Sequence, residues 1–249
     1  MITIYWAGDS TAAHNSIATW PQTGIAQEFS RFLRTDAVRI ENHAVNGRST
    51  LSFIDEGRLA PIYNRITKGD FLFIQFGHND EKAEDPVRYA DPATVFPQNL
   101  EKFVNVARNK GAIPVIITPV ARYDRHLAAP LYRHDRWAEA ARQTGKRLDV
   151  AVIDLTAASE RLLDEWGPAA QTALYMNLPA DVYPHFPQGQ RDNTHLQPAG
   201  AVVFGALIAR ALRALGGDYA ALLCNDYVQA LAEWGQSGTP MRQGEEAQA

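Results

Sequence analysis

Cysteine is nearly absent from this sequence. Cys224 is the single cysteine among 249 residues. One cysteine cannot form an intramolecular disulfide, so a small fold held together by disulfides is excluded, and nothing indicates adaptation to an oxidising compartment. Because Cys224 lies near Leu222, Leu223 and Tyr227, we expect it to be buried among apolar neighbours and not to act as a nucleophile.

Blocks of like charge and long apolar runs are also lacking. The net charge is −4 without a concentration of either sign, which argues against nucleic acid or an anionic membrane as the main partner. The most apolar late segment, Ala199–Leu215, carries Arg210 and Arg213, so it predicts an amphipathic helix and not a membrane span. The residues after Met1 lack the basic region, apolar stretch and cleavage site of a secretory signal, and we therefore expect a cytoplasmic protein.

Motifs for metals and nucleotides are missing as well. The seven histidines and the one cysteine show no His-x-x-x-His or cysteine-rich spacing, so the sequence predicts no metal and no other cofactor. No glycine-rich phosphate-binding motif follows a predicted strand, which disfavours a nucleotide-binding module. The acidic Asp80–Asp85 segment predicts a solvated loop in preference to a calcium site.

Short apolar runs alternate with longer segments of helical periodicity. Hydrophobic residues make up 46% of the chain, enough to build a sizeable core. The clearest strand is almost continuously apolar, as expected where helices cover both faces of a parallel sheet. The pattern predicts an α/β fold, a three-layer sandwich around a central parallel sheet of about five strands. The predicted strands are Ile2–Ala7, Val38–Ala44, Asp70–Phe76, Ile113–Thr118 and Val150–Leu155.

Helices are predicted between these strands and after the last one. Gly24–Leu33 is expected to be helical, residues 100–107 carry an apolar helical face, and Pro198 marks the start of the last helix. No internal repeat or linker divides the chain, which predicts one domain over residues 1–234. Residues 235–249 are polar and aperiodic, so a mobile tail is expected there.

Polar residues cluster where the chain leaves the predicted strands. In a parallel sheet these carboxyl ends lie at one edge. Ser10 follows the first strand on an expected strand-to-helix turn, and Asp192 and His195 share a loop before the last helix. A serine hydroxyl becomes a nucleophile when a base removes its proton and a third group orients that base. The pattern therefore predicts Ser10 as nucleophile, His195 as base and Asp192 as the orienting carboxylate.

Hydrogen-bond donors for a developing oxyanion are expected at the same edge. The backbone N–H groups of Ser10 and Gly47 and the side-chain amide of Asn79 each follow a predicted strand. Glycine at position 47 leaves room for the substrate oxygen, and an amide at position 79 donates without carrying a titrating charge. We therefore expect Ser10, Gly47 and Asn79 to form an oxyanion hole.

These residues fall in four blocks that resemble the SGNH, or GDSL-type, hydrolases. A lone Gly-Asp-Ser is common, but four blocks in the right order, each at a predicted strand or helix end, are specific. The resemblance implies a flavodoxin-like SGNH hydrolase fold and a serine esterase that needs no metal. The blocks are Gly8-Asp9-Ser10, Gly47, Gly77-His78-Asn79 and Asp192-Asn193-Thr194-His195.

The amino-acid sequences of these blocks are most similar to those of the rhamnogalacturonan acetylesterase branch. The resemblance covers roughly residues 1–215. Matching positions make Ser10 the nucleophile, Gly47 and Asn79 oxyanion donors, and Asp192 and His195 the rest of the triad. The resemblance implies removal of O-acetyl groups from plant cell-wall carbohydrate of the pectin type, and the missing signal favours oligosaccharides as substrates. The segments are Gly8-Asp-Ser-Thr, Ala44-Val-Asn-Gly-Arg-Ser, Gln75-Phe-Gly-His-Asn-Asp, Thr118-Pro-Val-Ala-Arg and Asp192-Asn-Thr-His-Leu.

Several alternatives stay open at this point. Ser10 could cap a helix, and Asp192 with His195 could be a capping pair. A short-chain lipase, thioesterase or lysophospholipase would use the same triad, and a carbohydrate-binding protein could retain the fold without activity. The α/β-hydrolase fold is disfavoured because Ser10 is not in a Gly-x-Ser-x-Gly elbow. Residues 220–234 form either a partner surface or an extra helix, and a homo-oligomer stays an alternative.

Other side chains are expected near the same edge, with ordinary packing or surface ion pairing as the alternative for each. Two arginines could pair with a sugar acid, two aromatic residues could stack on sugar rings, and a histidine could line the crevice. A further group could shape the acyl pocket. The arginines are Arg48 and Arg122, the aromatic residues are Trp20 and Tyr123, and the histidine is His78. The group expected at the acyl pocket is Tyr183, His185 and Phe186.

Overall fold

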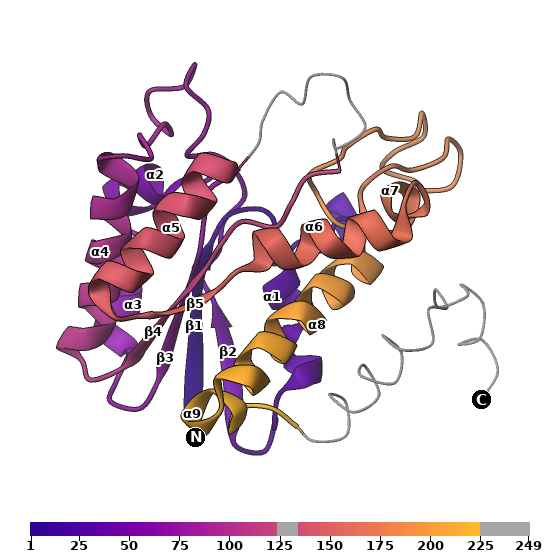
Figure 1. The fold of residues 1–249 in the computed structure, drawn as a ribbon. Helices are drawn as coiled ribbons and strands as arrows, with labels where there is room; N and C mark the ends of the chain where they lie inside the picture. Colours follow the sequence, from indigo (N-terminus) through magenta and orange to yellow (C-terminus); the bar gives the residue numbers. More distant parts are fainter. Residues whose placement is uncertain (124–133, 225–249) are drawn as a thin grey trace.

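A computed structural model describes residues 1–123 and 134–224 of the chain. The end of the C-terminal extension lies outside the described residues, and so does the predicted tail. These are residues 225–234, which include Tyr227, and residues 235–249. Five strands and the helices packed on them form three layers (Figure 1). The predicted α/β sandwich with a flavodoxin-like sheet is therefore confirmed.

The sheet is parallel throughout, with strand order β2-β1-β3-β4-β5. The chain passes from β1 to β2 on one side and then crosses back to β3 on the other. This reversal makes the carboxyl ends of β1 and β3 the place where an open α/β sheet forms a crevice. The strands are β1 (Ile2–Gly8), β2 (Val38–Asn42), β3 (Phe71–Gln75), β4 (Ile113–Ile117) and β5 (Ala151–Ile153).

All five predicted strands are present, and most are shorter than predicted at one or both ends. Asp70, predicted as the first residue of the third strand, instead precedes it, and its Oδ1 accepts a hydrogen bond from the Thr3 backbone at 2.8 Å. Its other oxygen, Oδ2, accepts the backbone N–H of Thr67, three residues earlier, at 2.9 Å, so the carboxylate closes the turn that leads into β3.

Helices cover both faces of the sheet. In Figure 1 the group from α2 to α5 lies on one side and the group with α1, α6 and α8 on the other. The first group contains α2 (Thr50–Asp55), α3 (Leu59–Arg65), α4 (Val95–Asn109) and α5 (Asp135–Leu148). The second contains α1 (Ile25–Glu28), α6 (Leu155–Trp166), α7 (Ala169–Leu174), α8 (Pro198–Leu215) and α9 (Gly217–Ala220), with short 3₁₀ helices η1 (Ile17–Thr19) and η2 (Phe29–Phe32).

Two apolar clusters fill the space between the sheet and its helices. Alternate residues of one strand point to opposite faces, so Phe73 belongs to the cluster under α1 and α8, whereas Leu72 and Ile74 belong to the cluster under α4. Both clusters are essentially inaccessible to solvent. Burial on both faces explains why these strands are continuously apolar.

The prediction of one continuous helix over Gly24–Leu33 is wrong. The structure places α1 over the first part and the 3₁₀ helix η2 over the second. A 3₁₀ helix aligns residues three apart on one side, and Phe29 and Phe32 both use this alignment to reach the core with 0% exposure. Periodicity alone did not show that two aromatic rings must face the same way.

Helix α8 agrees with the predicted last helix and begins with Pro198 at its first position. It is long and apolar enough to span a membrane by length and composition, but it is packed into the core under the sheet. Two glycines permit this close packing: a Cβ on Gly200 would lie 2.1 Å from the Leu174 carbonyl oxygen, and one on Gly205 would lie 2.9 Å from the Phe32 ring. We assign α8 as a core helix.

The segment after α8 returns to the start of the fold. Leu223 forms an antiparallel bridge with Leu33, and the Arg34 backbone donates to the Leu222 carbonyl at 3.0 Å. Leu222 and Leu223 are buried, but Cys224 is only half-buried, with its thiol 3.8 Å from the Arg31 carbonyl. The expected burial of Cys224 is therefore wrong, because the chain reaches the surface at that residue.

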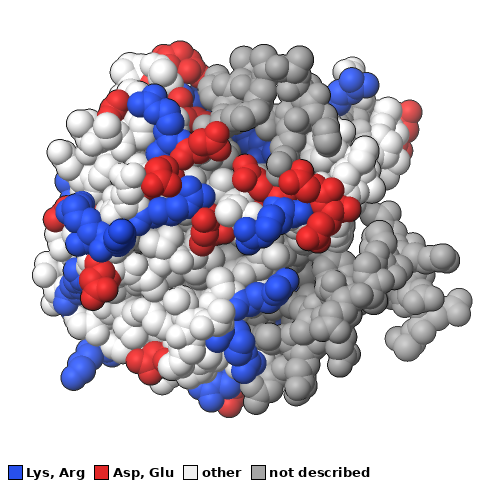
Figure 2. All heavy atoms as spheres, in the orientation of Figure 1, with Lys and Arg blue, Asp and Glu red and all other residues white. Residues whose placement is uncertain are grey.

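Charged side chains are dispersed over the visible surface. Figure 2 shows Lys and Arg interspersed with Asp and Glu on the face turned to the viewer, without an extended region of one sign. Neighbouring charges of opposite sign largely cancel beyond about 10 Å in physiological salt. This face therefore offers no long-range field for an anionic polymer.

Candidate active site

Ser10 lies directly beyond β1, in a turn fixed by its neighbour Asp9. The Asp9 Oδ1 accepts hydrogen bonds from the backbone and hydroxyl of Thr11 at 2.9 and 2.7 Å. The Asp9 carbonyl accepts further bonds from the backbones of Ala12 and Ala13. No helix starts at Ser10, contrary to the strand-to-helix turn that we expected, because these bonds close a turn instead. Ser10 is 6% exposed, at the floor of a cleft.

The structure brings Ser10, His195 and Asp192 into one chain of hydrogen bonds. His195 Nε2 lies 3.0 Å from Ser10 Oγ, and His195 Nδ1 lies 2.6 Å from Asp192 Oδ2. Both distances are within hydrogen-bonding range. The arrangement has the nucleophile, base and orienting group of an activated serine.

The loop that carries Asp192 and His195 is held from two sides. The other Asp192 oxygen, Oδ1, accepts the backbone N–H groups of Thr194 and His195 at 2.8 and 3.0 Å. The Tyr123 backbone donates to the Asn193 carbonyl at 2.9 Å, and the Met176 backbone donates to the His195 carbonyl at 2.9 Å. The imidazole is therefore fixed in position before substrate arrives.

The environment of Asp192 keeps its carboxyl ionised. Burial alone would raise its pKa, but the hydrogen bond and charge of His195, with the two backbone donors, lower the pKa to about 2. The carboxylate is consequently charged at neutral pH. It can stabilise positive charge on the imidazole without accepting the proton.

Gly47 and the backbone of Ser10 present donors to the same cleft. Both residues line it, and within the described part of the chain no acceptor takes either backbone N–H. Gly47 has φ = +77°, and a Cβ there would have only Arg88 within 4.0 Å. The left-handed backbone therefore favours glycine here, and no other atom of the described residues would crowd a side chain at this position.

The side-chain amide of Asn79 lines the cleft as predicted. Its Nδ2 donates to the Arg48 carbonyl at 3.0 Å, and its Oδ1 accepts from Arg88 Nη1 at 3.4 Å. An amide nitrogen carries two hydrogens, so one remains for a ligand. The bond to Arg48 fixes the plane of the amide.

Replacing Asn79 with alanine is expected to lower kcat for an acetyl ester by about 10²- to 10³-fold, the usual cost of one oxyanion donor. KM should change little, since the donor acts most strongly on the transition state. Steady-state kinetics on 4-nitrophenyl acetate measure both constants. Asn109→Ala, at the far end of α4, is the matched control. A kcat within twofold of the wild-type value would remove Asn79 from the oxyanion hole.

The cleft itself has a volume of about 250 Å³. The segments after β1, β2 and β3 and the loop before α8 all contribute to it, as the sequence predicted. None of its lining residues is aliphatic, which makes it polar for a site that would accept an ester. The lining residues are Ser10, Gly47, His78, Asn79, Lys82, Arg88, Arg122, Asp192, Thr194 and His195.

A buried ionic cluster supports one wall of the cleft. The Glu81 carboxylate accepts hydrogen bonds from Arg122 Nη2 at 2.9 Å and lies 2.9 Å from His134 Nδ1. Arg122 also donates to the Thr194 hydroxyl. Glu81 and Asp80 are buried, so the solvated loop expected over Asp80–Asp85 is wrong at its start.

Of the other side chains expected near the site, some line the cleft and others lie elsewhere. Arg122 and His78 line the cleft, and burial holds the pKa of His78 well below its usual range, so His78 is neutral. Arg48 instead pairs with Glu56 at 3.0 Å. Tyr123 is buried in the core and does not present a stacking surface, whereas Trp20 is 44% exposed.

Tyr183, His185 and Phe186 do not line the described cleft, contrary to the expected acyl pocket. They belong to a turn in which the Phe186 backbone donates to the Tyr183 carbonyl at 2.9 Å. Sequence reasoning also missed Lys82, Arg88 and Thr194 as lining residues. For Lys82 a signal existed, since it follows Asn79 by three residues at the same sheet edge.

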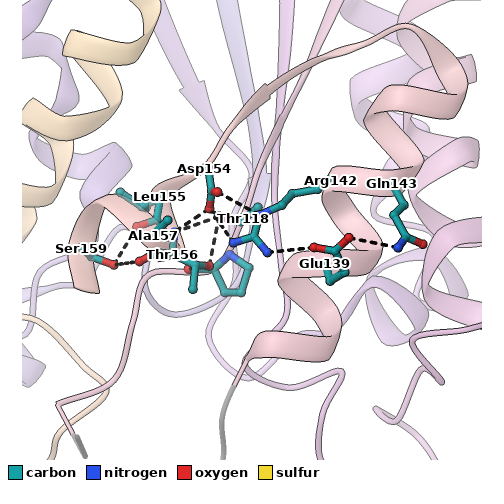
Figure 3. A network of polar contacts seen from close by, with 10 residues as sticks. Thr118, Glu139, Arg142, Gln143, Asp154, Leu155, Thr156, Ala157 and Ser159 are labelled. Atoms are coloured by element: carbon teal, nitrogen blue, oxygen red, sulfur yellow. Dashed lines mark hydrogen bonds and ion pairs between the residues drawn. The ribbon is translucent and has the colours of Figure 1, made fainter. Parts of the chain in front are cut away.

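A second cluster of serine, threonine and aspartate occurs at the carboxyl end of β5. Asp154 accepts two hydrogen bonds from Arg142 at 2.8 and 2.9 Å and caps α6 through the Ala157 backbone (Figure 3). Ser159 is engaged with the Ala121 backbone. No histidine belongs to this network as it is drawn, so it joins α5 to α6 and is not a second triad.

Metal-binding groups are not assembled here. Over residues 1–123 and 134–224, no three His, Cys, Asp or Glu side chains lie close enough together to hold a metal ion.

Asp80 is a buried carboxyl next to Asn79. Its Oδ1 accepts the backbone and hydroxyl of Thr50 at 2.9 and 2.5 Å, while its Oδ2 has no hydrogen-bond partner in the described residues. Burial raises the pKa of Asp80 to about 7, and the nearby Asp9 acts in the same direction. The folded protein therefore holds a proton here that the unfolded chain releases near pH 4.

Because the folded state binds this extra proton between about pH 4 and pH 7, Asp80 makes the free energy of unfolding fall as pH rises through that window, by at most about 1.4 kcal/mol per pH unit. Asp80→Asn removes the titration and keeps the acceptor for Thr50. We expect its unfolding free energy, measured in urea from pH 5 to 7.5, to fall less steeply than that of the wild type. Asp55→Asn, on the surface of α2, should keep the wild-type slope. Parallel profiles for wild type and Asp80→Asn would contradict the assignment.

Comparison with known proteins identifies the family of the chain. The GDSL-like Lipase/Acylhydrolase family model matches residues 6–203. The rhamnogalacturonan acetylesterase RhgT of Bacillus subtilis (strain 168) is 38% identical over 217 residues, which cover 86% of this chain and 91% of that protein. The probable rhamnogalacturonan acetylesterase YesY of the same organism is 35% identical over 213 residues, covering 86% and 93%. The resemblance to this branch is confirmed.

Solved structures share the fold. Protein YXIM_BACsu from Bacillus subtilis superposes with a TM-score of 0.72 at 24% identity, covering 86% of this chain but only 57% of that one. A catalytic mutant of the acetylxylan esterase Axe2 from Geobacillus stearothermophilus superposes with a TM-score of 0.60 at 14% identity, covering 84% and 93%. With the family match over most of its length, the chain belongs to the GDSL-like lipase/acylhydrolase family and is a carboxylic ester hydrolase.

Proposed function

We propose that the protein removes O-acetyl groups from carbohydrate, through an acetyl-Ser10 intermediate. The observation that carries this proposal is the hydrogen-bonded chain from Ser10 through His195 to Asp192. Ser10 and Gly47 also line this cleft, and no acceptor among the described residues takes their backbone N–H groups. Ser10 supplies the nucleophile, and the donors supply a place for negative charge. Both are needed for acyl transfer.

In the first half of the reaction, Ser10 Oγ attacks the ester carbonyl carbon while His195 Nε2 accepts its proton. The carbonyl oxygen becomes an oxyanion that receives hydrogen bonds from the backbones of Ser10 and Gly47 and from the Asn79 amide. Asp192 stabilises the imidazolium. When the intermediate collapses, the bond to the sugar oxygen breaks, His195 protonates that oxygen, and the acetyl group stays on Ser10 as an ester.

In the second half, water takes the place of the sugar. His195 removes a proton from the water, and the resulting hydroxide attacks the acetyl carbon within the same set of donors. Collapse releases acetate and returns the proton to Ser10. No residue needs to move between the two halves, because the same imidazole serves both.

The preference for a small acyl group and a polar alcohol comes from the cleft. Its described lining is polar or charged, and no aliphatic side chain is available to bury an acyl chain. Each buried methylene group is worth about 0.8 kcal/mol, and a lining without aliphatic side chains offers little of it to a long acyl chain. Together with the names of the relatives RhgT and YesY, this supports acetylated oligosaccharides of plant cell walls as substrates.

A chain-length series tests the acyl preference. We expect kcat/KM to fall by at least about tenfold from 4-nitrophenyl acetate to the octanoate, since the added methylenes meet no apolar surface. Equal or faster octanoate hydrolysis would favour a lipase or lysophospholipase instead.

A second measurement identifies the alcohol. Release of acetate from acetylated rhamnogalacturonan, xylan and pectin fragments is compared at equal ester concentration. The proposal expects the fastest release from a rhamnogalacturonan fragment. Sugar binding without release of acetate from any fragment would show a binding protein on a hydrolase fold.

A further inference from the structure

Three cationic side chains, Lys82, Arg88 and Arg122, line the cleft beside the candidate triad. Asp192 is the single acidic residue in the described lining, and its carboxylate is engaged by His195. Cationic side chains thus outnumber acidic ones in the described lining. Their partners decide which of these cations is left to bind a ligand.

The two arginines already have anionic partners. Arg122 pairs with the buried Glu81 at 2.9 Å. Arg88 pairs with Asp85 at 2.5 Å and also donates to the Asn79 side chain. Both guanidinium groups thus serve to shape the wall of the cleft, and their charges are locally compensated.

Lys82 differs from both arginines. Its backbone is fixed by a hydrogen bond to the Asn79 carbonyl at 3.3 Å. Its ammonium group has no hydrogen bond or ion pair with any residue in the described part of the chain. Glu84 and Asp85 lie close enough to act on it electrostatically, but Asp85 is paired with Arg88.

The position of Lys82 is unfavourable for an unpaired charge. Partial burial, and then the neighbouring Arg88 and Arg122, lower the pKa of its ammonium group. A partly desolvated cation without a partner gains most from an anion that enters with the ligand. One uncompensated ammonium matches a singly charged anion such as the carboxylate of a uronic acid.

We propose that Lys82 binds a carboxylate of the acetylated saccharide and so makes the enzyme selective for uronic-acid-containing esters. This inference rests on the proposed deacetylation of carbohydrate and adds the charge of the substrate. It replaces the earlier expectation for Arg48 and Arg122. Arg48 is paired with Glu56 outside the described lining, and Arg122 is held by Glu81.

The test uses two forms of one substrate. An O-acetylated oligosaccharide that contains uronic acid is compared with the same oligosaccharide after its carboxyl groups have been reduced to primary alcohols. Acetate release gives kcat/KM for each. The wild type is expected to prefer the acidic form by about 10- to 100-fold, the range for one charge-assisted hydrogen bond, and the preference should shrink as salt is added.

Variants test whether Lys82 is the residue that causes the preference for the acidic form. Lys82→Met is expected to bring the ratio of the two kcat/KM values to within about threefold of unity, because the charge-assisted bond is lost, and Lys82→Arg to retain most of the preference. Lys146→Met, on the exposed C-terminal turn of α5, should keep the wild-type ratio. Circular dichroism and the melting temperature verify that each variant is folded. The ratio of the two kcat/KM values in the wild type is a test that does not depend on any variant.

The outcomes separate this inference from the proposed function. Equal rates for the two forms in the wild type, or an undiminished preference in folded Lys82→Met, would overturn the role of Lys82 and leave the acetylesterase assignment intact. Turnover of neither form, together with loss of activity on 4-nitrophenyl acetate, would overturn the proposed function itself.

Discussion

Ser10→Ala is expected to lower kcat/KM for 4-nitrophenyl acetate by about 10⁴- to 10⁶-fold, the range seen when a triad serine is removed. The Ser10 hydroxyl lies 3.0 Å from the histidine that Asp192 contacts, so the substitution removes the oxygen that this base is placed to activate. Binding of substrate should persist, because the oxyanion donors are unchanged. The melting temperature should change little, since the substitution removes one oxygen from the edge of a cleft.

The matched control is Ser16→Ala, which removes a hydroxyl that caps η1 farther along the same loop. It should keep activity close to that of the wild type. Acetyl-enzyme formation can be followed independently by mass spectrometry after rapid quenching. A folded Ser10→Ala protein with wild-type activity would mean that the nucleophile lies elsewhere.

Asp192→Asn is expected to lower kcat by about 10⁴-fold while KM stays within a few-fold of the wild-type value. An asparagine presents an NH₂ group either to His195 Nδ1 or to the backbone N–H groups that Oδ1 now accepts. In the first case the imidazole must adopt the wrong tautomer, and in the second two donors oppose each other. Steady-state kinetics with 4-nitrophenyl acetate measure the loss.

The pH dependence follows from the low pKa of Asp192. A carboxyl with a folded pKa of about 2 and an unfolded value near 4 stabilises the fold above pH 4, and this contribution is lost as pH falls towards 2. The unfolding free energy of Asp192→Asn should therefore respond less to acid than that of the wild type. Asp181→Asn, on an exposed left-handed residue nearby, should behave as the wild type does. Full activity in folded Asp192→Asn would show that the carboxylate does not orient His195.

Sequence patterns predicted the sheet well because its strands are buried on both faces. A run such as Phe71–Gln75 has no exposed position, and few other structures produce such a run. The place of Ser10 was predictable for a related reason: it follows a strand end, and parallel strands bring such ends to one edge. Asp192 and His195 reach that edge from the loop before α8. Patterns failed where tertiary contacts set local geometry, as in the 3₁₀ turn of Phe29 and Phe32 and the non-helical turn at Ser10.

The character of the cleft wall was not predictable from sequence alone. Lys82, Asp85 and Arg88 appear in the sequence as ordinary members of a mixed-charge loop. Only the folded loop shows that Asp85 neutralises Arg88 and leaves Lys82 without a partner among the described residues. Pairing among charges three to six residues apart depends on turn geometry, for which a linear pattern carries little information.

The contact between Ser10 and His195 joins residues 185 positions apart. Ser10 lies directly after the first strand and His195 in the loop before the last long helix, so the proposed reactive pair is complete only when the two ends of the fold have met. Under the proposed mechanism, hydrolysis therefore reports completed folding. A chain whose two ends have not met carries a serine that the proposed base does not activate.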